Sequence, residues 1–231
     1  MSKITKRKDL KHWRSSKNAA DVGKLRIIGG QFRGRQISYS GDPITRPMKD
    51  DIREAIFNLV GGWVADKAVF DLFAGTGAVG LEAISRGAKQ AYLVERHFPT
   101  VRIIKENVAL LTGESELPIT IASSDTFFWC RKFFKNESEW PTEPWIVFFC
   151  PPYNFYVKHE PEVLQLLEQF IQKAPNNSLF VVESDKRFDP SKLPTVESVD
   201  GCVENQWAVR QYSPAVVSVL KKNFPNEPLA E

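Results

Sequence analysis

A glycine-rich turn beside acidic residues is the stretch of this sequence best suited to chemistry. An apolar run ends at Asp71 and leads through Phe73 into Gly75-Thr76-Gly77-Ala78-Val79-Gly80, which has the spacing G-x-G-x-x-G. Glu95 closes the next apolar run, at about the 20-residue separation where an acidic side chain receives ribose hydroxyls. The pattern predicts a nucleotide cofactor site that includes Asp71, Phe73, Gly75, Thr76, Gly77 and Glu95.

The carboxylate of Asp71 favours one cofactor over another. A nicotinamide dinucleotide would bring a dianionic pyrophosphate to this turn, where Asp71 would repel it. S-adenosylmethionine carries an ammonium and a sulfonium, which a carboxylate attracts. We therefore predict S-adenosylmethionine, with Asp71 facing its ammonium and Glu95 its ribose diol. A nicotinamide-dependent dehydrogenase is the competing hypothesis.

Ser124 and Asp125 follow the third apolar run of the chain. The Asp125 carboxylate is placed to accept a hydrogen bond from the adenine amino group of the cofactor. The same residue could instead cap the N-terminus of a helix, a role for which Asp is well suited. Both interpretations of Asp125 stay open from the sequence.

The segment Cys150-Pro151-Pro152-Tyr153 comes directly after the fourth apolar run. Open α/β sheets place their chemistry at the carboxyl ends of strands, and two prolines would make this loop rigid. The Pro151 carbonyl could grip a hydrogen of an exocyclic base amine, and Tyr153 could stack on a flipped-out base. A simple Pro-Pro turn with an aromatic cap is the alternative. We predict that Cys150, Pro151, Pro152 and Tyr153 form the catalytic loop.

Two further segments carry a family resemblance. Arg26-Ile27-Ile28-Gly29-Gly30-Gln31-Phe32-Arg33-Gly34-Arg35, followed by Arg46-Pro47 and Arg53-Glu54-Ala55-Ile56-Phe57-Asn58, resembles the RsmD-type 16S ribosomal RNA guanine-N2 methyltransferases. The resemblance spans residues 25 to 222 and implies methylation of one guanine in small-subunit ribosomal RNA or a 30S assembly particle. On this basis we expect RNA contacts from Arg26, Arg33, Arg35, Arg46 and Arg53.

The chain departs from this family in two places. Met48 and Lys49 replace threonines that follow the Arg-Pro pair. Cys150 occupies the position of an Asp or Asn that would polarise the target amine, and a neutral thiol is a weak acceptor. A thiolate or another acceptor would have to stand in for the missing group.

The elements that position these residues follow from the periodicity of the sequence. Short apolar runs alternate with helical patterns from Ala68 to Val182, which predicts parallel strands with helices on both faces. Two runs, 207–212 and 215–220, lie too close together for a helical crossover and predict an antiparallel hairpin. The expected fold is α/β, a Rossmann-like class I methyltransferase. Its mostly parallel seven-stranded sheet should end in that hairpin and be preceded by an N-terminal β-hairpin and a helix.

Length and composition limit the number of domains and the location of the protein. The 231 residues are 42% hydrophobic, enough for one main core, and no stretch approaches the roughly 18 apolar residues of a membrane span. The N-terminus is basic and polar without an apolar signal core, so we expect a cytoplasmic protein, and we also expect a monomer. Because the three cysteines and three histidines are scattered, we expect no metal. A basic tail should occupy residues 1–23, a methyltransferase domain 24–222 and a short tail 223–231. The basic tail is either a solvated segment or an arm that binds phosphates.

Three functions compete with the RNA methyltransferase. A homologue could retain RNA and cofactor binding after losing catalysis, since Cys150 replaces the usual acceptor. Another amino-methyltransferase could act on adenine in DNA or on a protein glutamine. The third is the dehydrogenase considered above.

Overall fold

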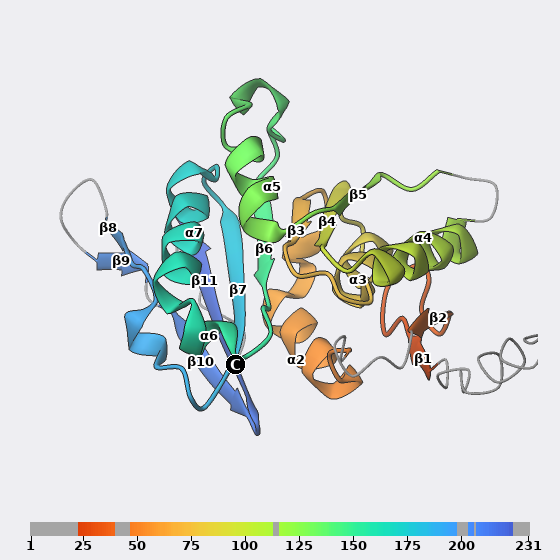
Figure 1. The fold of residues 1–231 in the computed structure, drawn as a ribbon, viewed down its shortest axis with the longest axis horizontal. Helices are drawn as coiled ribbons and strands as arrows, with labels where there is room; N and C mark the ends of the chain where they lie inside the picture. Colours follow the sequence, from red (N-terminus) through yellow and green to blue (C-terminus); the bar gives the residue numbers. More distant parts are fainter. Residues whose placement is uncertain (1–22, 40–46, 113–115, 198–202, 206, 224–231) are drawn as a thin grey trace, which may run out of the picture.

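A seven-stranded sheet forms the centre of the molecule (Figure 1). The structure, a computed structural model, describes residues 23–39, 47–112, 116–197, 203–205 and 207–223. The strand order is β10-β11-β7-β6-β3-β4-β5, in which β11 pairs antiparallel with β7 and with β10, and the other pairs are parallel. The strands are β3 (Ala68–Asp71), β4 (Gln90–Glu95), β5 (Ile119–Ser123), β6 (Trp145–Phe149), β7 (Ser178–Asp185), β10 (Ala208–Tyr212) and β11 (Ala215–Lys222). The predicted mostly parallel sheet with a C-terminal antiparallel hairpin is confirmed.

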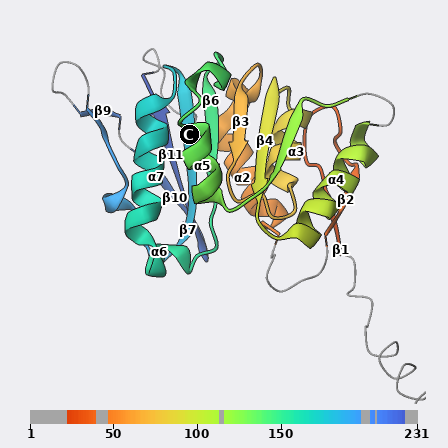
Figure 2. The same ribbon diagram turned by 45° about the horizontal axis from the view of Figure 1, so that its top comes forward.

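Helices cover both faces of this sheet (Figure 2). Ile56, Ala83 and Ile104 pack on one face, and they come from α2 (Asp50–Val60), α3 (Ala78–Ser85) and α4 (Phe98–Thr112). The other face is covered by α5 (Thr126–Phe133), α6 (Phe155–Lys158) and α7 (Glu160–Lys173). Because both faces are covered, the central strands β3 and β6 are buried along their whole length, which explains their continuous apolar runs.

An N-terminal hairpin packs outside these layers. Strands β1 (Gly23–Arg26) and β2 (Gln36–Tyr39) pair antiparallel, as predicted. Ile27 and Ile37 are buried against Leu81 of α3 and Leu111 of α4. The hairpin therefore extends the hydrophobic core beyond the edge of the sheet.

Several small elements had no clear signal in the sequence. Helix α5 is eight residues long and rich in aromatic side chains, so its periodicity is weak. The two-stranded pair β8 (Val196–Glu197) and β9 (Val203–Asn205) and the 3-10 turns η1 (Gly61–Val64), η2 (Glu137–Glu139) and η3 (Pro190–Lys192) are shorter still. The predicted tails, 1–23 and 223–231, lie almost entirely outside the described residues.

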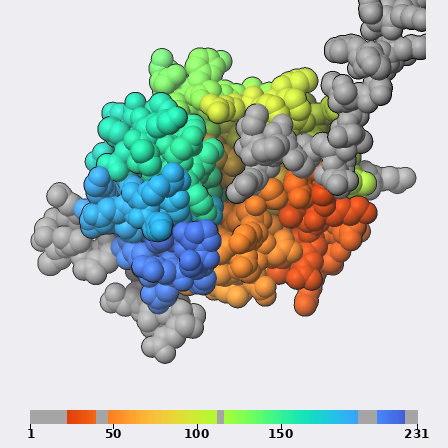
Figure 3. Space-filling view, turned by 60° about the horizontal axis from the view of Figure 1, so that its bottom comes forward, coloured from red at the N-terminus to blue at the C-terminus, as the bar shows by residue number. Residues whose placement is uncertain are grey.

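Helix α2 packs against the C-terminal strand β11 of the sheet. Side chains of α2 share a core cluster with Val217 and Val219 of β11. In Figure 3 the orange segment that includes α2 borders the blue C-terminal strands, and the red hairpin lies on the other side of that segment. No described helix combines the length and apolar character needed to cross a membrane.

Candidate active site

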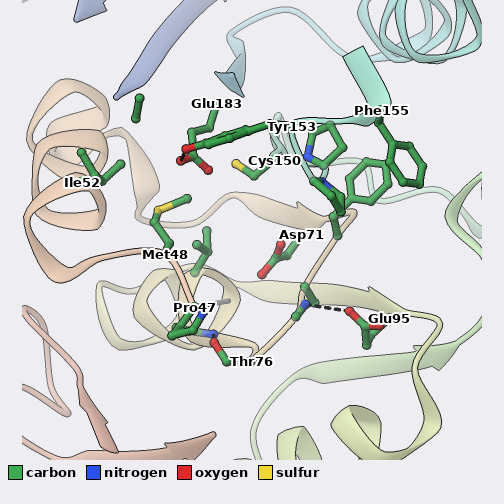
Figure 4. A pocket seen from close by; sticks show the side chains of 18 of the residues that line it. Pro47, Met48, Ile52, Asp71, Thr76, Glu95, Cys150, Tyr153, Phe155 and Glu183 are labelled. Carbon is green, nitrogen blue, oxygen red and sulfur yellow. Dashed lines mark hydrogen bonds between the residues drawn. The ribbon is translucent and has the colours of Figure 1, made fainter. Parts of the chain in front are cut away.

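A pocket of about 490 Å³ opens at the carboxyl ends of the parallel strands (Figure 4). Asp71 and Glu95 end β3 and β4, Cys150 follows β6 and Glu183 lies near the end of β7, and all four line the pocket. Residues 47–49 with Asp51 and Ile52 also line the pocket, as do residues 213–215 at the start of β11, which is the neighbour of β7 in the sheet. The pocket thus combines the predicted cofactor turn with the predicted catalytic loop, two segments about 75 residues apart in the chain.

Asp71 lies at the bottom of the pocket with only 2% of its surface exposed. Its Oδ2 accepts a hydrogen bond from the backbone N–H of Gly80 at 3.0 Å. Burial, aided by the nearby charge of Glu95, raises the pKa of this carboxyl to about 7, although the Gly80 amide acts in the opposite direction. A cationic ligand group would therefore be strongly favoured beside Asp71, because it would stabilise the buried charge.

The three glycines of the turn serve different purposes. Gly75 has a positive φ of 52° and lines the pocket, as predicted. Gly77 also has a positive φ, but a Cβ added there would meet Ile104 and Leu93 rather than the pocket. Gly77 closes the turn and is not among the residues that line the pocket, although Thr76 and Ala78 on either side of it are, so its contact with the cofactor stays a prediction. Gly80 lets α3 approach β4, since an added Cβ would lie 2.7 Å from a Leu93 methyl.

Glu95 joins the glycine turn to the loop after β4. Its Oε2 accepts from the Gly75 N–H at 2.9 Å and its Oε1 accepts from the His97 N–H at 2.7 Å. These bonds fix the carboxylate at the pocket surface (Figure 4). Each oxygen has a second lone pair, so Glu95 can still accept from ligand hydroxyls.

Asp125 caps helix α5 and also lines the pocket. Its Oδ1 accepts from the Phe128 N–H at 3.1 Å, which confirms the capping interpretation. Neighbouring Thr126 lines the pocket too and donates to the Leu72 carbonyl at 2.5 Å. Ser124 directs its hydroxyl to the Asp125 carbonyl, and it is not among the residues that line the pocket, so its predicted cofactor contact is not supported.

The loop after β6 brings Cys150, Pro151, Pro152 and Tyr153 to the pocket, as the sequence predicted. Burial raises the pKa of the Cys150 thiol well above its usual range, and the carboxylates of Glu183 and Asp71 raise it further. The thiol therefore stays neutral near physiological pH. A thiolate cannot supply the missing acceptor.

Glu183 is a pocket residue that the sequence analysis did not single out. It lies near the end of β7 and its Oε1 accepts from the Tyr153 hydroxyl at 2.6 Å. Burial raises the pKa of Glu183, while this hydrogen bond lowers it; the pKa of Tyr153 is raised by its burial and by the same bond. The available signal was a lone acidic residue directly after the apolar run 179–182. Only the pairing of β6 with β7 places it beside Cys150.

The side of the pocket opposite the sheet comes from the start of α2. Met48 and Ile52 lie across the pocket from Tyr153 and Cys150, and Pro47 lies beside Thr76 (Figure 4). Met48 stands where the family that this sequence resembles has a threonine, and it gives this side of the pocket an apolar surface. Such a surface suits the flat face of a base.

Arg53 corrects one of the predicted RNA contacts. Its side chain is wholly buried, and its Nη2 donates to the Arg26 carbonyl at 2.6 Å and to Asp50 at 2.9 Å. Its Nε also lies 3.8 Å from the buried Glu82 carboxylate. Arg53 therefore has a structural role, and its buried side chain is not accessible to RNA.

Glu82 completes this buried network under the hairpin. Its two carboxylate oxygens accept from the N–H groups of Ile28 and Gly29, each at 2.7 Å. Gly30 has a positive φ of 77°, and a Cβ there would overlap the Ser85 carbonyl. The glycines of the motif thus allow close contact between the hairpin and α3.

The remaining predicted RNA contacts differ in position. Arg26, Arg33 and Arg35 are exposed on the hairpin. Arg26 pairs with Asp50 at 3.2 Å, and Arg35 donates to the Leu111 carbonyl at 2.9 Å. Arg46 lies outside the described residues.

In the described parts of the chain, no three His, Cys, Asp or Glu side chains gather in a way that could hold a metal ion, and a metal-free site stays a prediction.

Comparisons with known proteins agree with this architecture. Residues 25–212 match the protein family described as "Conserved hypothetical protein 95". The chain is 34% identical over 180 residues to the ribosomal RNA small subunit methyltransferase D of Escherichia coli K12, covering 78% of this chain and 82% of that protein. The solved structure of a putative methyltransferase, yhhF, from Escherichia coli aligns with a TM-score of 0.65 at 24% identity, over 87% of this chain and 99% of that one.

A more distant structure shares the same fold. A putative SAM-dependent methyltransferase from Streptococcus mutans aligns with a TM-score of 0.63 at 18% identity, over 80% of this chain and 53% of that one. The predicted class I methyltransferase fold is confirmed by these likenesses.

Proposed function

Because the chain belongs to the ribosomal RNA small subunit methyltransferase D family, we propose that it methylates the exocyclic N2 amine of a guanine in small-subunit ribosomal RNA, with S-adenosylmethionine as methyl donor. The observation that carries the proposal is one pocket in which an acidic, glycine-lined end adjoins the loop Cys150-Pro151-Pro152-Tyr153. The first end suits the cofactor. The second suits a flat base with an amine.

The residues of the acidic end fit S-adenosylmethionine. The ammonium of the methionine part would lie next to buried Asp71, because a cation there offsets the cost of burying the Asp71 carboxylate. Glu95, held by two backbone amides, can accept from both ribose hydroxyls. Asp125 keeps acceptor capacity for the adenine amino group beyond its capping bond. Phe73 adds an apolar surface that packs edge-on against Phe149 and Phe155.

The same carboxylates disfavour a dinucleotide. A pyrophosphate bound at this turn would lie close to Asp71 and Glu95, and a buried carboxylate repels it strongly. The dehydrogenase hypothesis also requires a second parallel half of the sheet, which here is replaced by antiparallel β10 and β11.

Bound S-adenosylmethionine supplies an electrophilic methyl: a C–N bond forms from the amine lone pair as the S–C bond breaks toward sulfur, and one amine proton leaves. The protein must hold the amine in line and exclude water. The Pro151 carbonyl, rigidly placed after β6, can accept one amine hydrogen. The ring of Tyr153 and the side chain of Met48 can hold the two faces of the base.

RNA would approach across the hairpin. The side chain of Arg26 is 66% exposed, and Arg33 and Arg35 are exposed on the same hairpin. Lys49 and Arg96 add positive charge among the residues that line the pocket. Basic groups on both sides of a pocket at the strand ends can hold phosphates while one base enters.

Binding and labelling experiments test this function. Isothermal titration calorimetry should detect S-adenosylmethionine and not NAD. Tritiated cofactor should label ribosomal RNA in small subunits from cells that lack this gene, and a mass-spectrometric map of that RNA should identify one guanine without its N2 methyl. Label in DNA or in a release factor, with none in the small subunit, would overturn the assignment.

A catalytically impaired relative is the second candidate, and the neutral thiol of Cys150 is the observation that favours it. Such a protein would bind the cofactor and the small subunit with ordinary affinity. Single-turnover incubation with excess protein separates the two hypotheses, because a binding-only homologue would transfer no label even at long times.

A further inference from the structure

We propose that the carboxylate of Glu183 takes over the acceptor role that Cys150 cannot fill, holding one hydrogen of the target amine and receiving the proton that methylation releases. The inference rests on the proposed function and adds a residue from a different strand to its catalytic group. Its basis is the juxtaposition of Glu183, Cys150 and Tyr153 in the pocket (Figure 4).

Glu183 and Cys150 occupy adjacent positions on the sheet. Phe149 of β6 is registered with Val182 of β7, so the next residues of the two parallel strands also lie side by side. Both line the pocket. A carboxylate from β7 can therefore reach the space that an Asp or Asn at position 150 would serve, and its longer side chain compensates for its origin on the neighbouring strand.

The Glu183 side chain is oriented as a substrate acceptor would be. Among the described residues, the hydrogen bond recorded for this carboxylate comes from Tyr153 and ends on Oε1, which leaves Oε2 to accept from a ligand. The Tyr156 hydroxyl donates a hydrogen bond to the Glu183 backbone carbonyl at 3.1 Å. One contact fixes the side chain and the other fixes the backbone, so the acceptor is preorganised.

The surroundings of Glu183 also suit a proton acceptor. Its pKa is raised by burial, while a methylated amine that still carries its extra proton is a strong acid and would transfer that proton readily. The amine nitrogen keeps the new C–N bond, and the N–H electron pair returns to nitrogen as the proton moves to Oε2. No further reactant is needed.

Glu183→Gln tests the inference, because the amide keeps the size of the side chain but removes its charge. The single-turnover rate on small subunits should fall about ten- to a hundredfold, the range of a lost charge-assisted hydrogen bond. Cofactor affinity by calorimetry and small-subunit affinity by filter binding should stay near the wild-type values. Glu168→Gln, on the exposed surface of α7, is the matched control and should leave all three quantities unchanged.

A rescue distinguishes a chemical role from a structural one. Cys150→Asp placed in the Glu183→Gln protein returns a carboxylate to the same space, one that can accept from the amine and take its proton, and it should restore most of the lost rate. Failure of this rescue, with cofactor affinity intact, would overturn the inference. Glu183→Asp, which keeps the charge but shortens the side chain, provides a second variant and should also slow transfer.

The outcomes separate this inference from the function on which it rests. If the wild-type protein transfers no methyl group to small subunits, the proposed function fails. If the wild type is active and both Glu183 variants match it, the function stands and the role of Glu183 is wrong. A Glu183→Gln protein that loses cofactor binding would likewise assign Glu183 to the structure of the pocket and refute the inference.

Discussion

The replacement Asp71→Asn should stabilise the free protein while weakening its binding of cofactor. Asp71 is 2% exposed, and its pKa is raised from 3.8 to about 7, chiefly by burial. Asparagine keeps a side-chain oxygen that can accept from the Gly80 N–H and carries no charge. The variant therefore removes the cost of burying a carboxylate without emptying the space.

The magnitude follows from the two pKa values. The folded protein holds this proton more tightly than the unfolded chain, so the stability contributed by Asp71 is fully present below pH 3.8 and is lost as pH rises to about 7. A shift of about three units corresponds to about 4 kcal/mol at most. Of this, about 1.6 kcal/mol is lost by about pH 5 and the rest by about pH 8. The advantage of Asp71→Asn over wild type should thus grow by about 2 to 3 kcal/mol between those two pH values.

Urea unfolding of both proteins without cofactor, at about pH 5 and about pH 8, measures this difference. Thermal melts should agree, at roughly 2 to 4 °C per kcal/mol for a domain of this size. An advantage that is the same at both pH values would refute the argument, because it would show that the Asp71 carboxyl does not titrate between them.

The pH dependence of cofactor binding provides a second test of the Asp71 carboxyl, with a change in the opposite direction to that of stability. Below about pH 7 the carboxyl of the free protein is protonated, and an ammonium ligand must displace that proton. The association constant of the wild type should therefore rise with pH, by up to about tenfold per unit, and level off above about pH 7. Asp71→Asn should bind more weakly and lack this part of the pH dependence.

Three further predictions concern other parts of the molecule. Cys150→Ser should change the single-turnover rate by less than about threefold at saturating cofactor, since the thiol stays protonated; loss of activity would restore the thiolate hypothesis. Glu82→Gln should lower the urea-unfolding free energy by about 3 to 5 kcal/mol, because it removes the only wholly buried charged partner that Arg53 has among the described residues and replaces an oxygen that accepts from a hairpin N–H by an amide nitrogen. Glu160→Gln, at the exposed pair with Lys192, should cost less than about 1 kcal/mol, and equal costs for the two variants would contradict the role of the buried network. Deleting the residues before Lys24 should weaken RNA binding and flatten its salt dependence without changing cofactor affinity, and an unaltered salt slope would make the segment a simple tail.

The fold class and the local motifs could be predicted from the order of residues alone. Strands such as 145–149 are buried on both faces and therefore apolar throughout, so they could be found without knowing their neighbours. The turn from Asp71 to Gly80 and the loop from Cys150 to Tyr153 are each contiguous. Their chemistry is carried by residues a few positions apart, and both segments line the pocket.

Tertiary structure decided the roles that depend on pairing between distant segments. Arg53 looked like a basic residue available to RNA, but the packing of α2 under the hairpin buries it against Asp50 and the Arg26 carbonyl. Ser124 lies next to a predicted motif, yet its hydroxyl donates to the Asp125 carbonyl and it is not among the residues that line the pocket. A linear motif specifies the type of residue and its spacing, whereas burial and direction depend on the elements packed around it.

Glu183 is a pocket residue that the local sequence pattern did not reveal. In the sequence it is one acidic residue after an apolar run, 33 positions from Cys150. The parallel pairing of β6 with β7 brings the two residues together, and the Tyr153 hydroxyl then orients the carboxylate. Sheet register is set by the packing of the whole core, so no local pattern could reveal that an acceptor from the next strand stands beside the thiol.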